Sequence, residues 1–135
     1  MATLNPYLVF NGNCQEAMEF YKWCLGGELE LNTVGESPVA AQMPAEMQDK
    51  ILHARLTSGS IVLMGADMVA AEGHKHGNTI ALTLICASDQ EFDTLFSRFS
   101  ARGTVTQQAR QEFFGRFGTI KDQYGFDWMF LVLAT

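Results

Sequence analysis

His53, one of three histidines in this 135-residue chain, is a candidate for acid–base or anion-binding chemistry. It lies in the middle of segment 51–56, whose alternation predicts a β-strand. Successive strand side chains point to opposite faces, which gives two sets: Ile51, His53 and Arg55 on one face, and Leu52, Ala54 and Leu56 on the other. If a helix covers the second set, His53 faces a cleft, where it could act as a general base or bind an anion. A hydrogen-bonded structural histidine fits the same pattern.

Other side chains could line a binding site beside His53. Asp67 follows a predicted strand, where it would lie near the rim of a cleft or serve as a turn or capping aspartate. Arg116 could hold a carboxylate or phosphate through its planar guanidinium, unless the nearby Glu112 pairs with it. Aromatic side chains of the C-terminal region could form a pocket wall or part of the core: Phe113, Phe114, Phe117 and Trp128.

The helices that must support these groups occur twice in the sequence. Asn13 with Glu16, and 75 residues later Ser88 with Glu91, have the spacing of a capping box. An apolar stripe with helical spacing follows each cap: Ala17, Phe20, Tyr21, Cys24 and Leu25 in the first helix, and Phe92, Leu95, Phe96 and Phe99 in the second. Glycines follow both stripes and end the helices, because glycine accepts left-handed backbone conformations easily.

Strand-like segments flank the two helices in the same order. These are 7–10, 28–32 and a hairpin over 51–64 in the first half, and 80–86, 104–108 and a hairpin over 118–133 in the second. Each half therefore predicts a β-α-β-β-β module. We expect a single domain over residues 1–135, with module one at about 4–65, a linker at 66–78 and module two at about 79–135. An ordinary α+β domain with two similar segments is the alternative.

Motifs along the whole chain carry a family resemblance. They are 5–12, 16–21, 25–28, 53–54 with Gly59, 63–64 with Asp67, 113–118, Asp122, 124–125 and 128–129. In these motifs the sequence resembles the PhnB-like branch of the vicinal-oxygen-chelate (glyoxalase/bleomycin resistance/dihydroxybiphenyl dioxygenase) superfamily. The resemblance implies an α+β fold in which two β-α-β-β-β modules form a curved mixed sheet around a small-molecule cleft, with the helices outside.

Enzymes of the resembled superfamily hold a divalent metal with His, Gln or Glu side chains on the first and last strands of each module. Carried over one by one, the four ligand positions fall on Asn5 or Pro6, Leu63, Thr79 and Met129. Leu and Met do not ligate hard divalent ions, so we expect no metal site and no cofactor. The first hypothesis is therefore a protein that binds a small organic molecule in an aromatic cleft through His53, Asp67, Phe114, Arg116 and Trp128.

Two other classes of function stay open. A metal-dependent lyase, isomerase or dioxygenase could use a non-standard ligand set, such as His53, the candidate catalytic residue, with His74 or His76 of the linker; those two also fit a solvated loop. A structural or regulatory partner module is the third possibility. The sequence has no glycine-rich strand-to-helix turn for S-adenosylmethionine, which argues against the methyltransferase label given to some members of this branch. The sequence does not identify the ligand.

Composition narrows the partners and the location. The net charge of −6 and the scattered nine Lys and Arg residues argue against nucleic acid. No apolar run approaches the ~20 residues of a membrane span. Residues 1–5 have no basic stretch followed by an apolar core, so we expect no secretory signal. Three cysteines without a CxxC motif indicate free thiols and a cytoplasmic location. We also expect a homodimer, because clefts of the resembled superfamily often form at dimer interfaces and the apolar segment 129–133 would leave an exposed strand edge unless it is covered.

Overall fold

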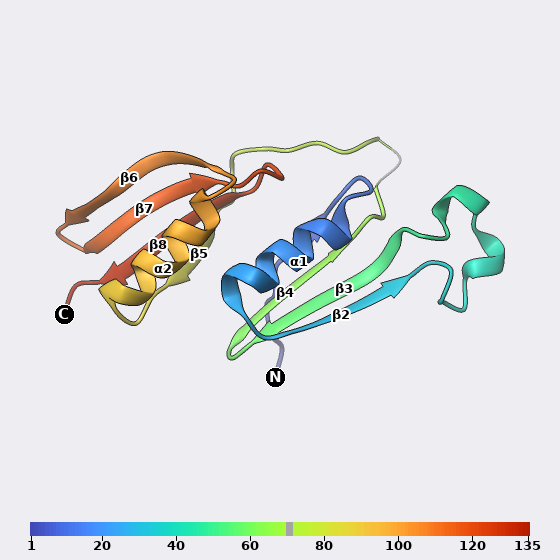
Figure 1. The fold of residues 1–135 in the computed structure, drawn as a ribbon, viewed down its shortest axis with the longest axis horizontal. Coiled ribbons are helices and arrows are strands. Elements are labelled where there is room, and N and C mark those ends of the chain that lie inside the picture. Colours follow the sequence, from blue (N-terminus) through green and yellow to red (C-terminus); the bar gives the residue numbers. More distant parts are fainter. Residues whose placement is uncertain (70–71) are drawn as a thin grey trace. The chain divides into compact units, whose positions relative to one another are not determined.

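The computed structural model describes residues 1–69 and 72–135, which form two compact units, Met1–Lys75 (unit 1) and His76–Thr135 (unit 2). Unit 1 contains β1 (Tyr7–Val9), α1 (Cys14–Leu25), β2 (Glu28–Thr33), the 3-10 helices η1 (Ala40–Gln42) and η2 (Ala45–Met47), β3 (Ile51–Ser58) and β4 (Ile61–Ala66). Unit 2 contains β5 (Leu82–Ile85), α2 (Asp89–Ser100), β6 (Thr104–Glu112), β7 (Gly115–Lys121) and β8 (Asp127–Leu133). Both units follow the predicted β-α-β-β-β order (Figure 1).

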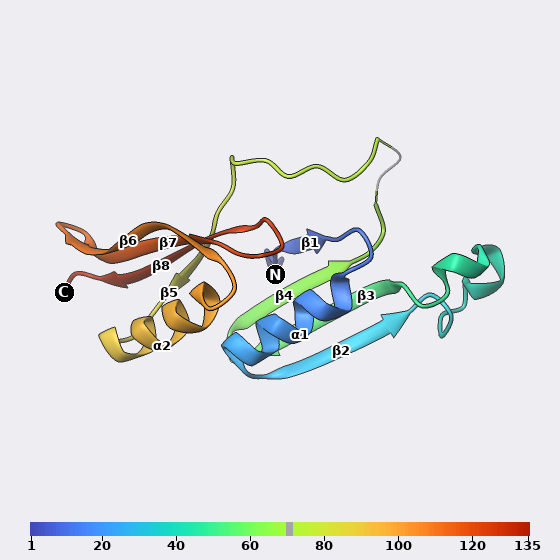
Figure 2. The ribbon, with the colours of Figure 1, turned by 45° about the horizontal axis from the view of Figure 1, so that its top comes forward.

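Each unit has one four-stranded mixed sheet and one α-helix among the described residues. The strand orders are β1-β4-β3-β2 and β5-β8-β7-β6, and in each sheet the first two strands of this order are parallel. Helix α1 packs against β2, β3 and β4, and α2 packs against β7 and β8. Figure 2 shows each helix lying along one face of its own sheet. The α+β fold class of the sequence prediction is confirmed.

The face of the unit 1 sheet under α1 is apolar. Leu56 of β3 lies opposite Leu29 of β2 and Leu63 of β4, and both Leu56 and Leu63 are buried. Residues directly opposite each other in a sheet point to the same side, so this row faces the helix. Ala54 belongs to the same face and is also buried.

The other face of this sheet carries the polar and aromatic residues. One row crosses all four strands, from Glu30 through Arg55 and Met64 to Tyr7. His53, paired with Asn32, lies two residues along β3 from Arg55 and therefore on the same side. We call this surface, formed by Glu30, Asn32, His53, Arg55, Met64, Tyr7 and Val9, the α1-distal face.

The simple alternation predicted for 51–56 is wrong at its first residue. The pairing with β2 jumps from Asn32–His53 to Thr33–Ile51, so Leu52 is left out of the register. Ile51 is buried, whereas Arg55 is exposed. This bulge interrupts the period-two pattern of the strand. Ile51 therefore does not share the exposed face of His53 and Arg55.

The two helices begin in different ways. Ser88 caps α2 as predicted, accepting a hydrogen bond from the Glu91 backbone N–H at 3.1 Å. Asn13, the predicted cap of α1, makes no side-chain cap bond. The carboxylate of Asp67 instead accepts the N–H of Cys14 at 3.0 Å. A residue distant in sequence thus supplies a side-chain acceptor at the start of α1, although for the N–H of Cys14 and not for that of Glu16, which the capping-box spacing assigned to Asn13.

Segment 129–133 is covered by a neighbouring strand, which is one of the two outcomes that its apolar sequence left open. It belongs to β8, which lies between β5 and β7 and pairs with both. The parallel pairing with β5 (Leu82–Ile85) covers the side that the hairpin leaves open. Within the described ranges, no helix has the length and apolarity that a membrane crossing requires.

Candidate functional site

His53 lies on the α1-distal face, as predicted from the alternation of β3. Its ring is half-buried, and its centroid lies 6.0 Å from that of Tyr7 at an interplanar angle of 35°. Tyr7 is 47% exposed. Burial of its hydroxyl, and secondarily the neighbouring Cys14, raise the pKa of Tyr7 above its ordinary value, so the phenol stays protonated and can donate a hydrogen bond at neutral pH.

Arg55 gives the α1-distal face an exposed positive charge. It lies between Glu30 and Met64 in the same cross-strand row. In residues 1–69 and 72–135 the guanidinium forms no ion pair, although Glu30 is directly opposite. The alternation of β3 places Arg55 on the same face as His53, but the sequence prediction of site residues includes neither Arg55 nor Tyr7. Only the parallel pairing of β1 with β4 places Tyr7 in this row.

The carboxylate of Asp67 is buried and hydrogen-bonded within unit 1. It is 6% exposed, and its two carboxylate oxygens accept backbone N–H groups from three residues: Gly12 at 2.9 Å, Cys14 at 3.0 Å and Ile51 at 2.9 Å. These bonds join the loop before α1 to the start of β3. The geometry is that of a buried capping aspartate, which the sequence left open as one of two roles.

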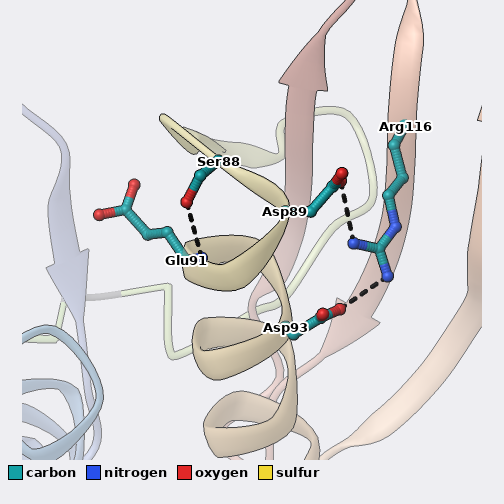
Figure 3. A network of polar contacts seen from close by, with 5 residues as sticks. All are labelled: Ser88, Asp89, Glu91, Asp93 and Arg116. Atoms are coloured by element: carbon teal, nitrogen blue, oxygen red, sulfur yellow. Dashed lines mark hydrogen bonds and ion pairs between the residues drawn. The ribbon is translucent and has the colours of Figure 1, made fainter.

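Arg116 binds two carboxylates of its own unit. Its guanidinium donates to Asp89 at 3.2 Å and Asp93 at 2.7 Å, which lie one turn apart on α2 (Figure 3). The same group lies 4.2 Å from the centroid of the Phe92 ring, a cation–π contact. The hydrogen bond that Arg116 donates to Asp93, ahead of the smaller effect of Asp89, raises the pKa of Arg116. The suggested Glu112 pairing is wrong, because Glu112 pairs with Arg110 at 2.8 Å.

Trp128 lies in the core of unit 2, facing α2. It is 3% exposed, its ring centroid lies 4.6 Å from that of Phe99, and its Nε1 donates to Asp122 at 2.8 Å. Asp122 also accepts the N–H groups of Tyr124 and Phe126, which closes the turn between β7 and β8. Of the two roles that the sequence left open for Trp128, the structure supports packing in the core.

Phe114 lies in the turn between β6 and β7, on the side of the sheet away from α2. Its ring is 39% exposed and packs on Phe117 with centroids 5.4 Å apart. Phe117 pairs with Leu131, one position beyond the α2-facing Phe130, and therefore points away from the helix. Arg110 lies over the Phe117 ring, with its guanidinium carbon 5.2 Å from the ring centroid. Phe114 therefore stays exposed, whereas Arg116 and Trp128 lie on the helix side.

The residues at the transferred metal positions do not share one orientation. Leu63 faces α1 in the core, whereas Met129, opposite Thr83 and Thr119, points away from α2. Among the described residues, no group of three His, Cys, Asp or Glu side chains is placed to hold an ion.

The two linker histidines contact different units. The Nε2 of His74 lies 2.8 Å from the carbonyl oxygen of Val9 in unit 1. The His76 ring packs edge-on against Phe126 in unit 2, with centroids 5.4 Å apart.

A family model described as 3-demethylubiquinone-9 3-methyltransferase matches residues 2–131. The chain belongs to this family. Protein YjdN of Escherichia coli (strain K12) is 32% identical over 141 residues, which cover 96% of this chain and 95% of that protein. The crystal structure of protein PA1353 from Pseudomonas aeruginosa has a TM-score of 0.87 at 36% identity and covers 98% of both chains.

More distant solved structures share the fold. The PhnB protein from Bacillus cereus, a putative 3-demethylubiquinone-9 3-methyltransferase by its name, has a TM-score of 0.74 at 21% identity, covering 97% of this chain and 99% of that one. A glyoxalase/bleomycin resistance protein/dioxygenase superfamily member from Sphaerobacter thermophilus has a TM-score of 0.62 at 18% identity, with 98% of each chain covered. The family model confirms the resemblance to the PhnB-like branch, and the solved structures show that the fold is shared with members of the wider superfamily.

Proposed function

We propose that the protein binds a small organic molecule on the α1-distal face of unit 1, without a resident metal ion. The observation that carries the proposal is the gathering of Tyr7, His53 and Arg55 on a sheet face turned away from the helix. Apolar surface beside a few polar groups is typical of small-molecule sites. Asp67, Arg116 and Trp128 have partners within their own units, so they support the fold in this proposal. Phe114 belongs to unit 2 and is not part of this face, so its predicted role in ligand binding stays a separate prediction.

Mass spectrometry of molecules that copurify with the protein tests this proposal. Purified protein is denatured, and the released compounds are compared between the native sequence, Tyr7→Ala and His53→Ala. We expect a stoichiometric compound that both variants lose. Arg102→Gln, which changes an exposed residue after α2, is the matched control and should retain the compound. Retention by both Tyr7→Ala and His53→Ala would contradict binding at this face.

Methyl transfer is a second candidate, favoured by the family description. The absence of a glycine-rich strand-to-helix turn in the sequence favours binding over this alternative. Isothermal titration with S-adenosylmethionine separates the two: measurable binding, with transfer of its methyl group to a demethylubiquinone, would establish the alternative and replace our proposal.

A metal-dependent lyase, isomerase or dioxygenase is the remaining enzymatic alternative, with His53 and either His74 or His76 as ligands. Elemental analysis of the purified protein, followed by titration with nickel, manganese, zinc and iron, tests it. We expect no stoichiometric ion. A stoichiometric ion that His53→Ala removes would overturn the metal-free proposal.

We also propose a cytoplasmic homodimer. The cytoplasmic location rests on the three free cysteines, Cys14, Cys24 and Cys86, which are buried without disulfides. The proposal of a homodimer is based only on the frequent formation of clefts at dimer interfaces in the superfamily. A monomer in sedimentation analysis at micromolar concentration would contradict it.

A further inference from the structure

The chemical class of the ligand follows from the charges on the α1-distal face. We infer that it is an organic anion whose negative group binds Arg55 and whose apolar part lies on Tyr7 and Met64. This inference rests on the proposed function and names the kind of molecule that the same face would select.

The first support is that Arg55 differs from three cations of unit 2. Arg110, Arg116 and Lys121 each form an ion pair within their own unit, with N–O distances from 2.7 to 3.2 Å. Arg55 is exposed on β3, an inner strand of its sheet, and has no such partner within the described part of the chain. A guanidinium offers paired donors that match a carboxylate or phosphonate.

The second support is what surrounds Arg55. His53 lies two residues away on the same strand face, where it can donate a further hydrogen bond. Met64, half-buried, is the direct neighbour of Arg55 on β4, and Tyr7 lies beyond it on β1. The phenol of Tyr7 is a donor, and its exposed ring adds apolar area. Three donors beside apolar surface fit an anion attached to an aromatic or aliphatic body.

Glu30 makes the inference sharper. It lies opposite Arg55 yet forms no ion pair with it. Its charge repels an incoming anion, because like charges raise the free energy of the bound state. Removing this charge should strengthen anion binding, while a neutral ligand should be nearly indifferent to the change.

Two fluorescent probes that differ by one anionic group provide the test. The anion 8-anilinonaphthalene-1-sulfonate and the neutral N-phenyl-1-naphthylamine are titrated into the full-length protein. Arg55→Gln should weaken sulfonate binding about five- to tenfold, as expected for a lost charge-assisted hydrogen bond. It should change neutral-probe binding by less than about twofold. Glu30→Gln should strengthen binding of the sulfonate alone, and the Arg102→Gln control should change neither probe.

Competition distinguishes the anion classes. Benzoate and phenylphosphonate should displace the sulfonate probe, and the more effective of the two identifies a carboxylate or a phosphonate preference. Benzamide, the neutral counterpart of benzoate, should displace it poorly. Benzamide equal to benzoate, or Arg55→Gln equal to Arg102→Gln, would overturn the inference. If Arg55→Gln fails to fold by circular dichroism, Glu30→Gln and the competition series decide the question.

Tyr7→Ala separates this inference from the proposed function. Loss of both probes in Tyr7→Ala, with Arg55→Gln binding both normally, would leave the binding face standing and refute the anion. Unchanged binding of both probes in Tyr7→Ala would refute the binding face itself.

Discussion

The two units share one chain order but use their cations differently. In unit 2, Arg116 ties β7 to α2, and Arg110 and Lys121 pair along and across the strands. In unit 1, Arg55 occupies the helix-free side of the sheet and has no ionic partner among the described residues. A repeated architecture therefore does not repeat its chemistry. The three paired cations of unit 2 contact their own unit, whereas we propose that Arg55 contacts a ligand.

The connections between strands differ as well. Strands β6 and β7 are joined by Phe113 and Phe114 alone, whereas residues 34–50 join β2 to β3. The longer connection is ordered by Gln48, whose side-chain amide donates to three carbonyl oxygens, of Ala40, Met43 and Pro44. Extra length in unit 1 thus comes with its own internal hydrogen bonds.

The largest expected effect concerns the buried aspartates, one in each unit. Asp67→Ala should lower the free energy of unfolding by about 4 kcal/mol, because three backbone N–H groups lose a charged acceptor. Asp122→Ala should cost less, about 2 kcal/mol, because its partners lie within six residues of it and the turn can adjust. Urea unfolding measures both. Asp49→Ala, at an exposed residue, is the control, and equal costs for both aspartates would refute the distinction.

A smaller difference in the free energy of unfolding is expected between alanine substitutions at the two glycines that follow the helices. Gly27 has a φ of +91°, and a Cβ there would overlap the carbonyl oxygen of Thr57. Gly103 has no positive φ, and its Cβ would lie 2.8 Å from the carbonyl oxygen of Lys121. Gly27→Ala should cost about 3 kcal/mol and Gly103→Ala about 1–2 kcal/mol in thermal or urea unfolding. The reverse order would show that backbone strain is not the deciding cost.

The two arginines provide a third and weaker contrast. Arg116→Gln should destabilise the protein by about 1 kcal/mol, because it loses two largely exposed ion pairs and the contact with Phe92. Arg55→Gln should change stability by less than about 0.5 kcal/mol, because Arg55 is exposed and forms no ion pair with any described residue. Added salt should shrink the Arg116 effect. A stability cost for Arg55→Gln as large as that for Arg116→Gln would indicate a structural role for Arg55.

The smallest effect on the free energy of unfolding is expected from ionisation of Cys14 and Cys86, which remain protonated at neutral pH. Burial, with a lesser contribution from Asp67, raises the pKa of Cys14 to about 12, and burial and Glu91 raise that of Cys86. The thiol form is favoured in the folded state, so the stabilising contribution of Cys14 is complete below pH 9 and is lost as the pH rises toward 12.

Alkylation with iodoacetamide at pH 8, followed by peptide mass spectrometry, checks this expectation. Cys14 should react more slowly than Cys86, and both should react far more slowly than in urea, because the thiolate is the reactive form. Labelling of folded Cys14 at the rate of the unfolded chain would contradict it.

Local sequence signals determined the elements of this protein. Helix spacing, the Ser88–Glu91 cap and the alternation of β3 are properties of neighbouring residues, and they predicted both modules and the orientation of His53. The resemblance of motifs spread along the chain predicted the family that the comparisons show. The helix, cap and strand signals involve only neighbouring residues, and the family signal adds up many short motifs. Both can therefore be recognised from the sequence without knowledge of the tertiary structure.

Tertiary structure decided the roles of single side chains. Asp67 replaced Asn13 as the acceptor at α1 because the fold brings a residue 53 positions away to the helix start. Arg116 found its carboxylates on α2, and Tyr7 joined Arg55 and His53 through the parallel pairing of β1 with β4. The sequence determined which segments form strands and helices. Contacts between residues distant in the chain depend on which strands pair and in which register, and these are properties of the tertiary structure. The tertiary structure therefore distinguishes side chains that contact their own unit, such as Asp67 and Arg116, from those that we propose for binding.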